Sequence, residues 1–484
     1  PRRISLPRRV GAQLPSGFDP SVYGIPADMI SALDRVAVWN LVATIDAFLD
    51  AGIEPAELLR WVHPADVANT QGTGIGGISA IRAMYVDSLL GEDRPNDVLQ
   101  EALPNVVAAH VMQSYVGGYG AMVHPVAACA TAAVSVEEAF DKIRSGRAEF
   151  VVAGGFDDYG PEGLVGFAAM NATASSDEMA AAGVTPARMS RPNDRRRAGF
   201  VEGQGGGTVL LARGDVAARL GLPVRGVVAW AGSFSDGVNT SIPAPGVGLV
   251  AAARGGAASH LSRRLAALGV TADDIAVVSK HDTSTQANDP NESLVHEVLA
   301  TSLERSPGNP LLVVSQKSVT GHAKGGAAAF QIAGLCQVLS SGVIPANRSL
   351  DCVDPALERH EHLVWPTSPI TSRRRLRAGL VTSLGFGHVA ALVAVVHPDV
   401  FVSLLPEGER VDYVERSRRR DLDGQRRRIA AQVGGPPLYR RPDRRLGPDP
   451  DAARGIELTM LVDPSTRLDD AGVLRGGVID EVVA

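Results

Sequence analysis

The stretch VHPVAACATAAVSVEEAF, residues 123–140, is the starting point for predicting the fold. Residues 123–128 are apolar and predict a short strand that enters a turn, and the alanine-rich residues after them predict a helix. Cys129 would lie where the turn becomes the helix. Unpaired N–H groups and the helix dipole favour a thiolate there. A free cysteine is more often a small buried hydrophobe, and this stretch alone favours that interpretation.

The composition is that of a folded globular protein. The chain has 484 residues, of which 45% are hydrophobic and 21% charged, enough for one large core or two. Three widely spaced cysteines are too few for a disulfide framework and favour a reducing, cytoplasmic setting. The sequence shows no membrane-length apolar run and no signal peptide, so we expect no membrane association. A net charge of −6 gives no reason to expect nucleic-acid binding.

Two consecutive series of strands and helices follow a lead-in segment and a first helix. The pattern predicts a mostly parallel, helix-covered α/β architecture with two related halves. The expected helices lie at 36–49, 249–268, 291–304 and 325–340, and the expected strands at 123–128, 150–153, 208–212, 224–229, 275–278, 311–314, 378–382 and 390–396. The division is 1–61 lead-in and helix, 62–215 first half, 216–400 second half and 401–484 an arginine-rich tail with no core of its own. The chain begins without methionine, which suggests a piece of a longer polypeptide.

Three further stretches place chemically useful side chains just after predicted strands. SKHDTSTQANDPNE, residues 279–292, places His281 at a strand end, and SQKSVTGHAKGG, residues 315–326, places Lys317 and His322 before a helix. TSLGFGH, residues 382–388, is a glycine-rich turn around Phe386. Sites in α/β proteins form at the carboxyl ends of strands. Two histidines, a lysine and a cysteine in such positions therefore predict one shared catalytic site.

These motifs resemble the β-ketoacyl synthase (ketosynthase) family of the thiolase-fold superfamily. The likeness is strongest to the ketosynthase of fungal and actinobacterial type I fatty acid synthases, and it covers residues 8–400. The matching motifs are ACAT at 128–131, HDTST at 281–285 with Asp289 and Glu292, KSVTGH at 317–322, GFG at 385–387, SRPND and AGFVEGQG within 190–205, and LPSGFD and YGIP within 14–26. Most ketosynthases have His-Gly-Thr-Gly-Thr, whereas Asp282 and Ser284 occupy the glycine positions here. Gln204 and His388 also depart from the usual pattern.

The resemblance implies a five-layered α-β-α-β-α thiolase fold and a decarboxylative condensation. Cys129 would take an acyl chain from a phosphopantetheine thioester, and His281 and His322 would stabilise the enolate formed from a malonyl thioester. Lys317 would tune these groups, with Glu292 as its charge partner and Asp289 as a supporting residue. The N–H groups of Cys129 and Phe386 would form the oxyanion hole, and the Phe386 side chain would gate the acyl pocket. No metal is expected.

The family resemblance also implies partners. No cofactor would bind directly, because substrates would arrive on the phosphopantetheine of an acyl carrier protein. The other domains of a fatty acid synthase and a second copy of this chain, within a larger homo-oligomer, are the expected neighbours. Dimerisation is expected through the glycine-rich segments 72–77 and 114–121, which suit close backbone approach.

Other interpretations predict different features. A polyketide-type ketosynthase, a non-catalytic partner of a megasynthase and a thiolase are the alternatives. A polyketide enzyme would carry trailing acyltransferase and carrier segments, a non-catalytic partner would lack the nucleophile, and a thiolase would use another motif set. The G-x-G-x-x-G match at 72–77 lacks a preceding buried strand, so a backbone turn is favoured over a nucleotide site. Cys336 and Cys352 have no histidine motif nearby and are expected to be structural.

Overall fold

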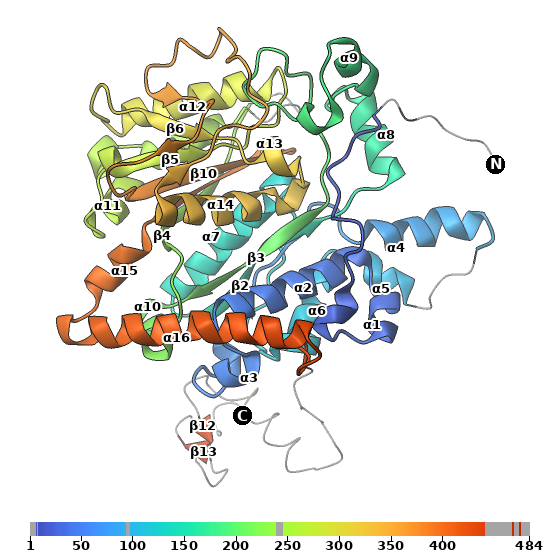
Figure 1. Cartoon of the computed structure of the whole chain (residues 1–484), viewed down its shortest axis with the longest axis vertical. Coiled ribbons are helices and arrows are strands. Elements are labelled where there is room, and N and C mark those ends of the chain that lie inside the picture. The colour runs from blue at the N-terminus through green and yellow to red at the C-terminus, as the bar shows by residue number, and fades with distance from the viewer. Residues whose placement is uncertain are drawn as a thin grey trace.

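The computed structural model describes residues 6, 8–92, 97–238 and 245–440, and the backbone at 467–468 and 474–475. Two β-sheets are separated by a layer of helices and are covered by further helices on their outer faces (Figure 1). This α-β-α-β-α arrangement confirms the five-layered fold that the family resemblance implied. Three large clusters of buried apolar side chains fill the spaces between the layers.

The first sheet has the strand order β1-β2-β3. Its strands are β1 (Val67–Asn69), β2 (Phe150–Asp157) and β3 (Gly205–Ala212). Strand β1 is parallel to β2, with Val67 opposite Phe150, and β3 is antiparallel to β2. Every residue of β2 is buried, because helices cover both faces of the sheet. The short β1 is a buried strand ahead of the glycine-rich 72–77 turn, where the sequence analysis expected only a polar segment.

The second sheet has six strands in the order β4-β11-β10-β5-β6-β8. Strands β10, β5, β6 and β8 run parallel, whereas β11 is antiparallel to both of its neighbours, so the two sheets are mixed. The strands are β4 (Val227–Ser235), β5 (Ile275–Ser279), β6 (Leu311–Val314), β8 (Leu363–Val364), β10 (Ala378–Gly385) and β11 (Val389–Val396). A small separate pair is formed by β7 (Val343–Ile344) and β9 (Ile370–Thr371), and another by β12 (Arg467–Leu468) and β13 (Leu474–Arg475).

Helices α7 (Thr131–Arg144) and α14 (Ala327–Ser341) form the central layer and contact both sheets. Both are rich in alanine, and small side chains let the helices approach the sheets closely while retaining helix propensity. Helix α2 (Arg35–Asp50) covers the outer face of the first sheet, and α11 (His260–Ala266) and α12 (Asn288–Ser302) cover the second. The remaining helices before α15 are α1 (Ala27–Ala32), α3 (Pro55–Leu58), α4 (Ile78–Arg82), α5 (Val98–Ala102), α6 (Val106–Val111), α8 (Pro161–Ala169), α9 (Ser176–Ala181), α10 (Gly214–Leu220) and α13 (Lys317–Thr320).

Two predicted elements are wrong. Residues 123–128 form no strand: Val123 N donates to Asn69 O, but Pro125 has no N–H to donate to a ladder and Ala128 has a left-handed φ of 46°. The helix expected at 249–268 is divided into a 3₁₀ segment at Val247–Ala253 and the shorter α11. The break contains Gly255 and Gly256, whose φ angles of 95° and 57° are left-handed.

The prediction that residues 401–484 form a tail with no core of its own is also partly wrong. Residues after His397 form α15 (Pro398–Leu404) and the 26-residue α16 (Glu407–Gln432), which lies along α2 (Figure 1). Tyr413 is buried and donates a hydrogen bond to the Leu222 carbonyl at 2.7 Å. Gly424 permits close contact, since a Cβ there would lie 2.0 Å from the Leu49 carbonyl oxygen. These helices therefore complete the outer layer, while most of 441–484 lies outside the described residues.

Candidate active site

Cys129 lies in a short 3₁₀ turn, Ala128–Ala130, that leads directly into α7. Ala128 has a φ of +46°, an unusual conformation for a residue with a Cβ. The turn is held by Thr131, whose hydroxyl accepts from Ala127 N at 3.0 Å and donates to Ala128 O at 2.8 Å. Ser383 of β10 donates to the Cys129 carbonyl at 2.9 Å. The helix start and the second sheet therefore fix the cysteine jointly.

Cys129 is 8% exposed and lines a cavity of about 260 Å³. Burial raises the pKa of this thiol to about 11, although the charges of Lys317 and Lys324 and a hydrogen bond from Phe386 N–H oppose the rise. The expectation that the helix start would favour a thiolate is therefore wrong in direction. Desolvation of the charged form outweighs the favourable dipole and nearby cations. The Cys129 thiol is therefore protonated at neutral pH.

His322 is the nearest titratable neighbour of the cysteine. Its Nε2 lies 3.1 Å from Cys129 Sγ. The residue follows α13, and its backbone is fixed by His322 N donating to Val201 O at 2.8 Å and by Gly203 N donating to His322 O at 2.9 Å. Burial and the charge of Lys317 lower the pKa of His322 well below its usual range, so the ring is neutral.

His281 lies just after β5, as predicted, and faces the same space. Its ring is perpendicular to that of His322, with centroids 5.2 Å apart. Cys129 Sγ and one ring nitrogen of each histidine all lie within 4.8 Å of one another. The structure thus brings together three side chains whose residues lie up to 193 positions apart in the sequence. Among the described residues, Cys129, His281 and His322 form the group whose possible ligand atoms lie close enough together to hold a metal ion.

Lys317 determines the tautomer of His281. Its Nζ lies 3.2 Å from His281 Nδ1 and also donates to the His281 carbonyl. Because an ammonium group only donates, Nδ1 accepts and the neutral ring carries its proton on Nε2. Burial, and then the charge of Lys317, lower the pKa of His281 well below its usual range. Burial also lowers the pKa of Lys317 to about 8.

Glu292 supports the His281 loop but is not the direct partner of Lys317. Its carboxylate accepts from His281 N at 2.6 Å, Asp282 N at 2.8 Å and the Thr382 hydroxyl at 2.6 Å. Among the described residues no direct ion pair joins Glu292 to Lys317, but the Glu292 charge raises the pKa of Lys317 against the effect of burial, so the predicted charge pairing acts at a distance. Burial raises the Glu292 pKa, but hydrogen bonding and nearby positive charge outweigh burial and hold the pKa well below its usual range.

Asp289 lies behind the same loop, on the first turn of α12. Its Oδ2 accepts from Asn193 N at 2.9 Å and lies 3.7 Å from Arg197 Nε. Burial and the neighbouring Asp282 charge raise the Asp289 pKa to about 7. Asp289 does not line the cavity that Cys129 and the histidines line. Its position is that of a supporting residue.

Phe386 lines the cavity beside Cys129, at the end of β10. Its backbone N–H is near enough to the cysteine sulfur to lower the pKa of the thiol. Its ring lies 6.2 Å from that of Phe167, which in turn contacts Phe200 at 5.3 Å. The three rings form an apolar wall on the approach to the sulfur.

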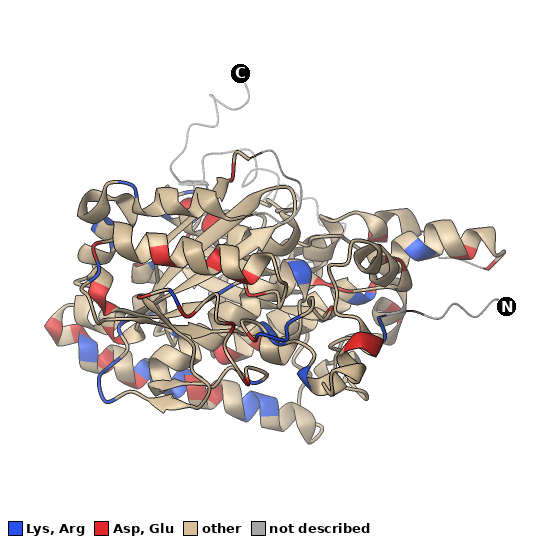
Figure 2. Ribbon diagram, turned by 90° about the horizontal axis from the view of Figure 1, so that it is seen from above, with Lys and Arg blue, Asp and Glu red and all other residues tan. Residues whose placement is uncertain are grey.

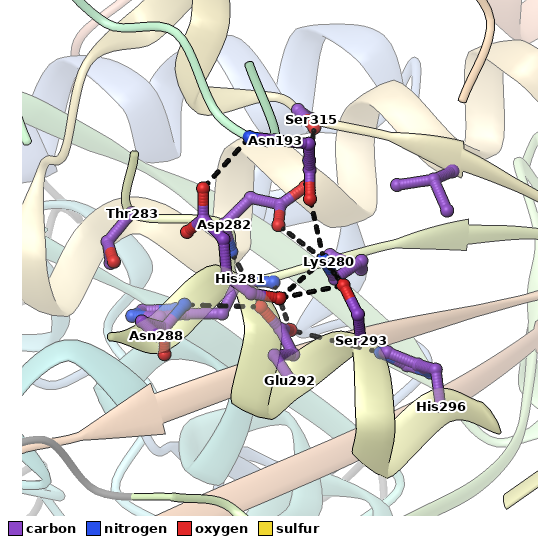
Figure 3. Close-up of polar contacts among 12 residues, drawn as sticks. Asn193, Lys280, His281, Asp282, Thr283, Asn288, Glu292, Ser293, His296 and Ser315 are labelled. Carbon is purple, nitrogen blue, oxygen red and sulfur yellow. Dashed lines mark hydrogen bonds and ion pairs between the residues drawn. The ribbon is translucent and has the colours of Figure 1, made fainter. Parts of the chain in front are cut away.

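Sequence reasoning missed several buried charged residues around the site. Lys280, Asn193 and Asp282 form a hydrogen-bonded cluster behind His281 (Figure 3). On the other side, Lys324 Nζ lies 3.1 Å from Glu202. The sequence feature that could have revealed this cluster is Lys280, which follows the apolar run that becomes β5. A charged side chain at the end of a buried strand requires a partner.

No helix among the described residues is long and apolar enough to cross a membrane. Charged residues of both signs are interspersed over the molecule (Figure 2).

Comparisons with known proteins identify the family of the chain. Residues 3–217 match the family model of the β-ketoacyl synthase N-terminal domain, and residues 226–351 match that of the C-terminal domain. The fold resembles the crystal structure of the ketosynthase FabY from P. aeruginosa, with a TM-score of 0.79 and 22% identity over 95% of this chain and 69% of that chain.

Curated relatives come from fungi. The chain is 41% identical to the fatty acid synthase alpha subunit stcJ of Emericella nidulans, over 97% of this chain and 30% of the relative. It is 35% identical to fatty acid synthase 2 of Mycosarcoma maydis, over 98% of this chain and 13% of the relative. The chain thus spans less than a third of the length of these relatives. Both domain models, matched in order along one thiolase-type fold, show that the chain belongs to the β-ketoacyl synthase family.

Proposed function

We propose that this chain catalyses the decarboxylative Claisen condensation that elongates an acyl chain in a type I fatty acid synthase. An acyl group on Cys129 would join a malonyl thioester to give a 3-oxoacyl thioester and carbon dioxide. The observation that carries the proposal is the placement of Cys129 Sγ, His281 and His322 around one buried cavity, with Sγ 3.1 Å from His322 Nε2. This intact set argues against a non-catalytic partner of a megasynthase.

The first half-reaction loads the cysteine. The sulfur attacks the carbonyl of the incoming acyl thioester, the new C–S bond forms, and the carrier thiol departs. Because burial raises the thiol pKa to about 11, a proton acceptor must assist the attack. His322 Nε2 is in place to take this proton and to return it to the departing thiolate, which leaves the imidazole neutral.

The second half-reaction forms the carbon–carbon bond. The malonyl thioester loses carbon dioxide, and the electron pair of the broken bond forms an enolate that attacks the acyl-Cys129 carbonyl. Neutral His281, with its proton on Nε2, donates a hydrogen bond to the enolate oxygen. Neutral His322 donates a second one from the tautomer with its proton on Nε2, so its ring exchanges tautomer after the loading step, in which Nε2 accepts the thiol proton. Preorganised donors of this kind are typically worth about 3–4 kcal/mol each in the barrier. The released thiolate then takes a proton from solvent.

The oxyanion of each tetrahedral intermediate requires its own donors. The N–H groups of Cys129 and Phe386 are proposed for this role, supported by the contact between Phe386 N–H and the cysteine sulfur. The Phe386 ring is proposed to gate the acyl pocket. Lys317 holds the His281 tautomer, and Glu292 and Asp289 hold the surrounding loop.

Substrates are proposed to arrive on the phosphopantetheine of an acyl carrier protein, with no cofactor bound by the chain itself. The fungal relatives are named as fatty acid synthases or their alpha subunits, which supports other synthase domains as partners. A cytoplasmic setting is proposed from the three widely spaced cysteines. The fungal relatives also favour the fatty acid synthase assignment over a polyketide enzyme.

A homodimer within a larger assembly is also proposed. The sequence pointed to the glycine-rich segment 72–77 as a dimer contact, but Gly72 and Gly77 already pack within the chain. A Cβ on them would lie 2.2 Å from Pro125 O and 2.1 Å from Glu101 O. The better candidate is the segment just before the nucleophile, where Met122, Val123 and Val126 are exposed. Pairing two such apolar segments about a two-fold axis would bury them.

The central experiment separates the half-reactions in the Cys129→Ala variant. We expect acyl-enzyme formation and condensation to be abolished while malonyl decarboxylation continues, because the enolate donors remain. Replacing His322 by Ala should impair decarboxylation and leave some Cys129 acylation. Radiolabelled acyl transfer and carbon dioxide release are followed separately. Condensation by Cys129→Ala would show that the nucleophile is assigned incorrectly.

A further inference from the structure

The loop that follows His281 has a backbone conformation normally reserved for glycine. Asp282 and Ser284 have φ angles of 39° and 64°. Residues with a Cβ are disfavoured there, so surrounding contacts must hold the loop. Ser284 is held through its backbone and hydroxyl: Gly199 N donates to its carbonyl at 2.8 Å, and Arg191 N donates to its Oγ at 3.1 Å.

Asp282 is held by an ion pair with the residue on the other side of the histidine. Lys280 Nζ lies 2.7 Å from Asp282 Oδ1, and neither side chain is exposed to solvent. The ammonium also donates to Asn193 Oδ1 at 3.0 Å and Ser293 Oγ at 2.9 Å. Burial lowers the Lys280 pKa, but the charges of Asp282 and other buried carboxylates outweigh burial and raise it, so Lys280 stays charged.

Asn193 joins the two charged residues from a distant part of the chain. Its Oδ1 accepts from Lys280, and its Nδ2 donates to Asp282 Oδ2 at 2.8 Å and to Ser315 Oγ at 3.1 Å. Figure 3 shows these side chains converging on the short segment that carries His281. The residues before and after the histidine are thus tied to one another and to a third loop.

We propose that the Lys280–Asp282 pair, bridged by Asn193, is a positioning device that fixes the left-handed turn and thereby the direction of the His281 imidazole. Neither Lys280 nor Asp282 lines the cavity, so the pair acts through His281, which lies between them in the chain and does line it. The inference rests on the proposed condensation reaction, in which His281 serves the enolate step and is not the loading partner of Cys129. It assigns Lys280 a role in one half-reaction only.

Removing Lys280 alone and removing both members of the pair should have different effects, which provides a test. Removing Lys280 alone leaves Asp282 as a buried carboxylate without its cation, close enough to raise the pKa of Asp289. The loop would then relax away from its left-handed turn and carry His281 with it. Replacing Asp282 by glycine at the same time removes the stranded charge and suits the φ of 39°. The double variant should therefore recover what the single variant loses.

The experiment uses the 484-residue chain with octanoyl-pantetheine and malonyl-pantetheine as probes. For Lys280→Met we expect kcat for malonyl decarboxylation to fall about tenfold to a hundredfold, the usual effect of misplacing a catalytic group. The rate of Cys129 acylation should stay within about twofold of wild type, because Cys129 and His322 lie on other loops. Lys280→Met/Asp282→Gly should recover most of the decarboxylation rate.

Lys142→Met is the matched control. Lys142 is also a buried lysine, but it pairs with Glu138 within α7, away from the His281 loop. It should leave the ratio of the two half-reaction rates unchanged. Equal losses of both half-reactions in Lys280→Met, or no recovery in the double variant, would overturn the inference and leave a purely structural pair. If Lys280→Met does not fold, Asp282→Asn replaces it, with an expected selective loss of about threefold in decarboxylation; an unchanged ratio would overturn the inference. A wild-type chain without acylation or decarboxylation would instead contradict the proposed function itself.

Discussion

Replacing Lys317 by methionine should raise the stability of the protein at pH 7 while lowering its activity. Burial lowers the pKa of Lys317 from 10.5 to about 8, so holding its charge inside the protein is unfavourable. A shift of this size corresponds to about 3 kcal/mol of stability lost at pH 7. Methionine has a similar length and removes that penalty. It also removes the amine's hydrogen bonds to His281, worth about 1 kcal/mol net, so the expected gain is about 2 kcal/mol.

The sign of the pH dependence follows from the direction of the shift. Between pH 8 and 10.5 the unfolded chain keeps the Lys317 proton that the folded protein has lost, so wild-type stability rises with pH in this window. The advantage of Lys317→Met should therefore shrink from about 2 kcal/mol at pH 7 to near zero at pH 10. Other titrating groups affect both proteins equally and cancel in the difference.

Urea unfolding of both proteins at pH 7 and pH 10 measures these differences, with Lys142→Met as the control. Lys142 is buried but ion-paired with Glu138, so its replacement should not stabilise the protein. A Lys317→Met variant less stable than wild type at pH 7, or a difference that does not change with pH, would refute the reasoning. The same variant should lose condensation activity, because His281 loses the donor that fixes its tautomer.

Four further outcomes are expected. Iodoacetamide at pH 7 should alkylate the exposed Cys352 before Cys129, whose pKa burial raises to about 11, and peptide mapping that found Cys129 modified first would contradict this. An acyl-shaped epoxide such as cerulenin should reverse the order by occupying the cavity beside Cys129, and an adduct at Cys352 alone would count against the assigned pocket. Tyr413→Ala should lower the free energy of unfolding by about 3–5 kcal/mol, measured by urea unfolding, because it removes a buried ring that anchors α16; a loss below 1 kcal/mol would show that α16 is not part of the core. Val126→Asp should shift the chain from dimer to monomer in sedimentation, and an unchanged dimer would exclude this segment from the interface.

Local signals predicted most of the architecture. Strands β5, β6, β10 and β11 and helices α2, α12 and α14 lie close to where periodicity placed them, because each contains a long, regular apolar pattern. The errors fall where tertiary context decides. The segment 123–128 has the composition of a strand, but its backbone pairing with β1 reaches no further than Val123 in the described structure, where Val123 N donates to Asn69 O. Helix α16 is polar in sequence yet packs through a few residues such as Tyr413 and Gly424.

The sequence by itself determined the four residues of the site, Cys129, His281, Lys317 and His322, because their motifs are local and each follows a recognisable strand or precedes a helix. Only the tertiary structure decided their chemical state. The protonated thiol, the neutral imidazoles and the low pKa of Lys317 all arise from burial by distant segments. The Lys280 contact with Asn193 likewise joins residues 87 positions apart. Desolvation and charge pairing depend on which groups meet in space, and that information is not carried by any short stretch of the chain.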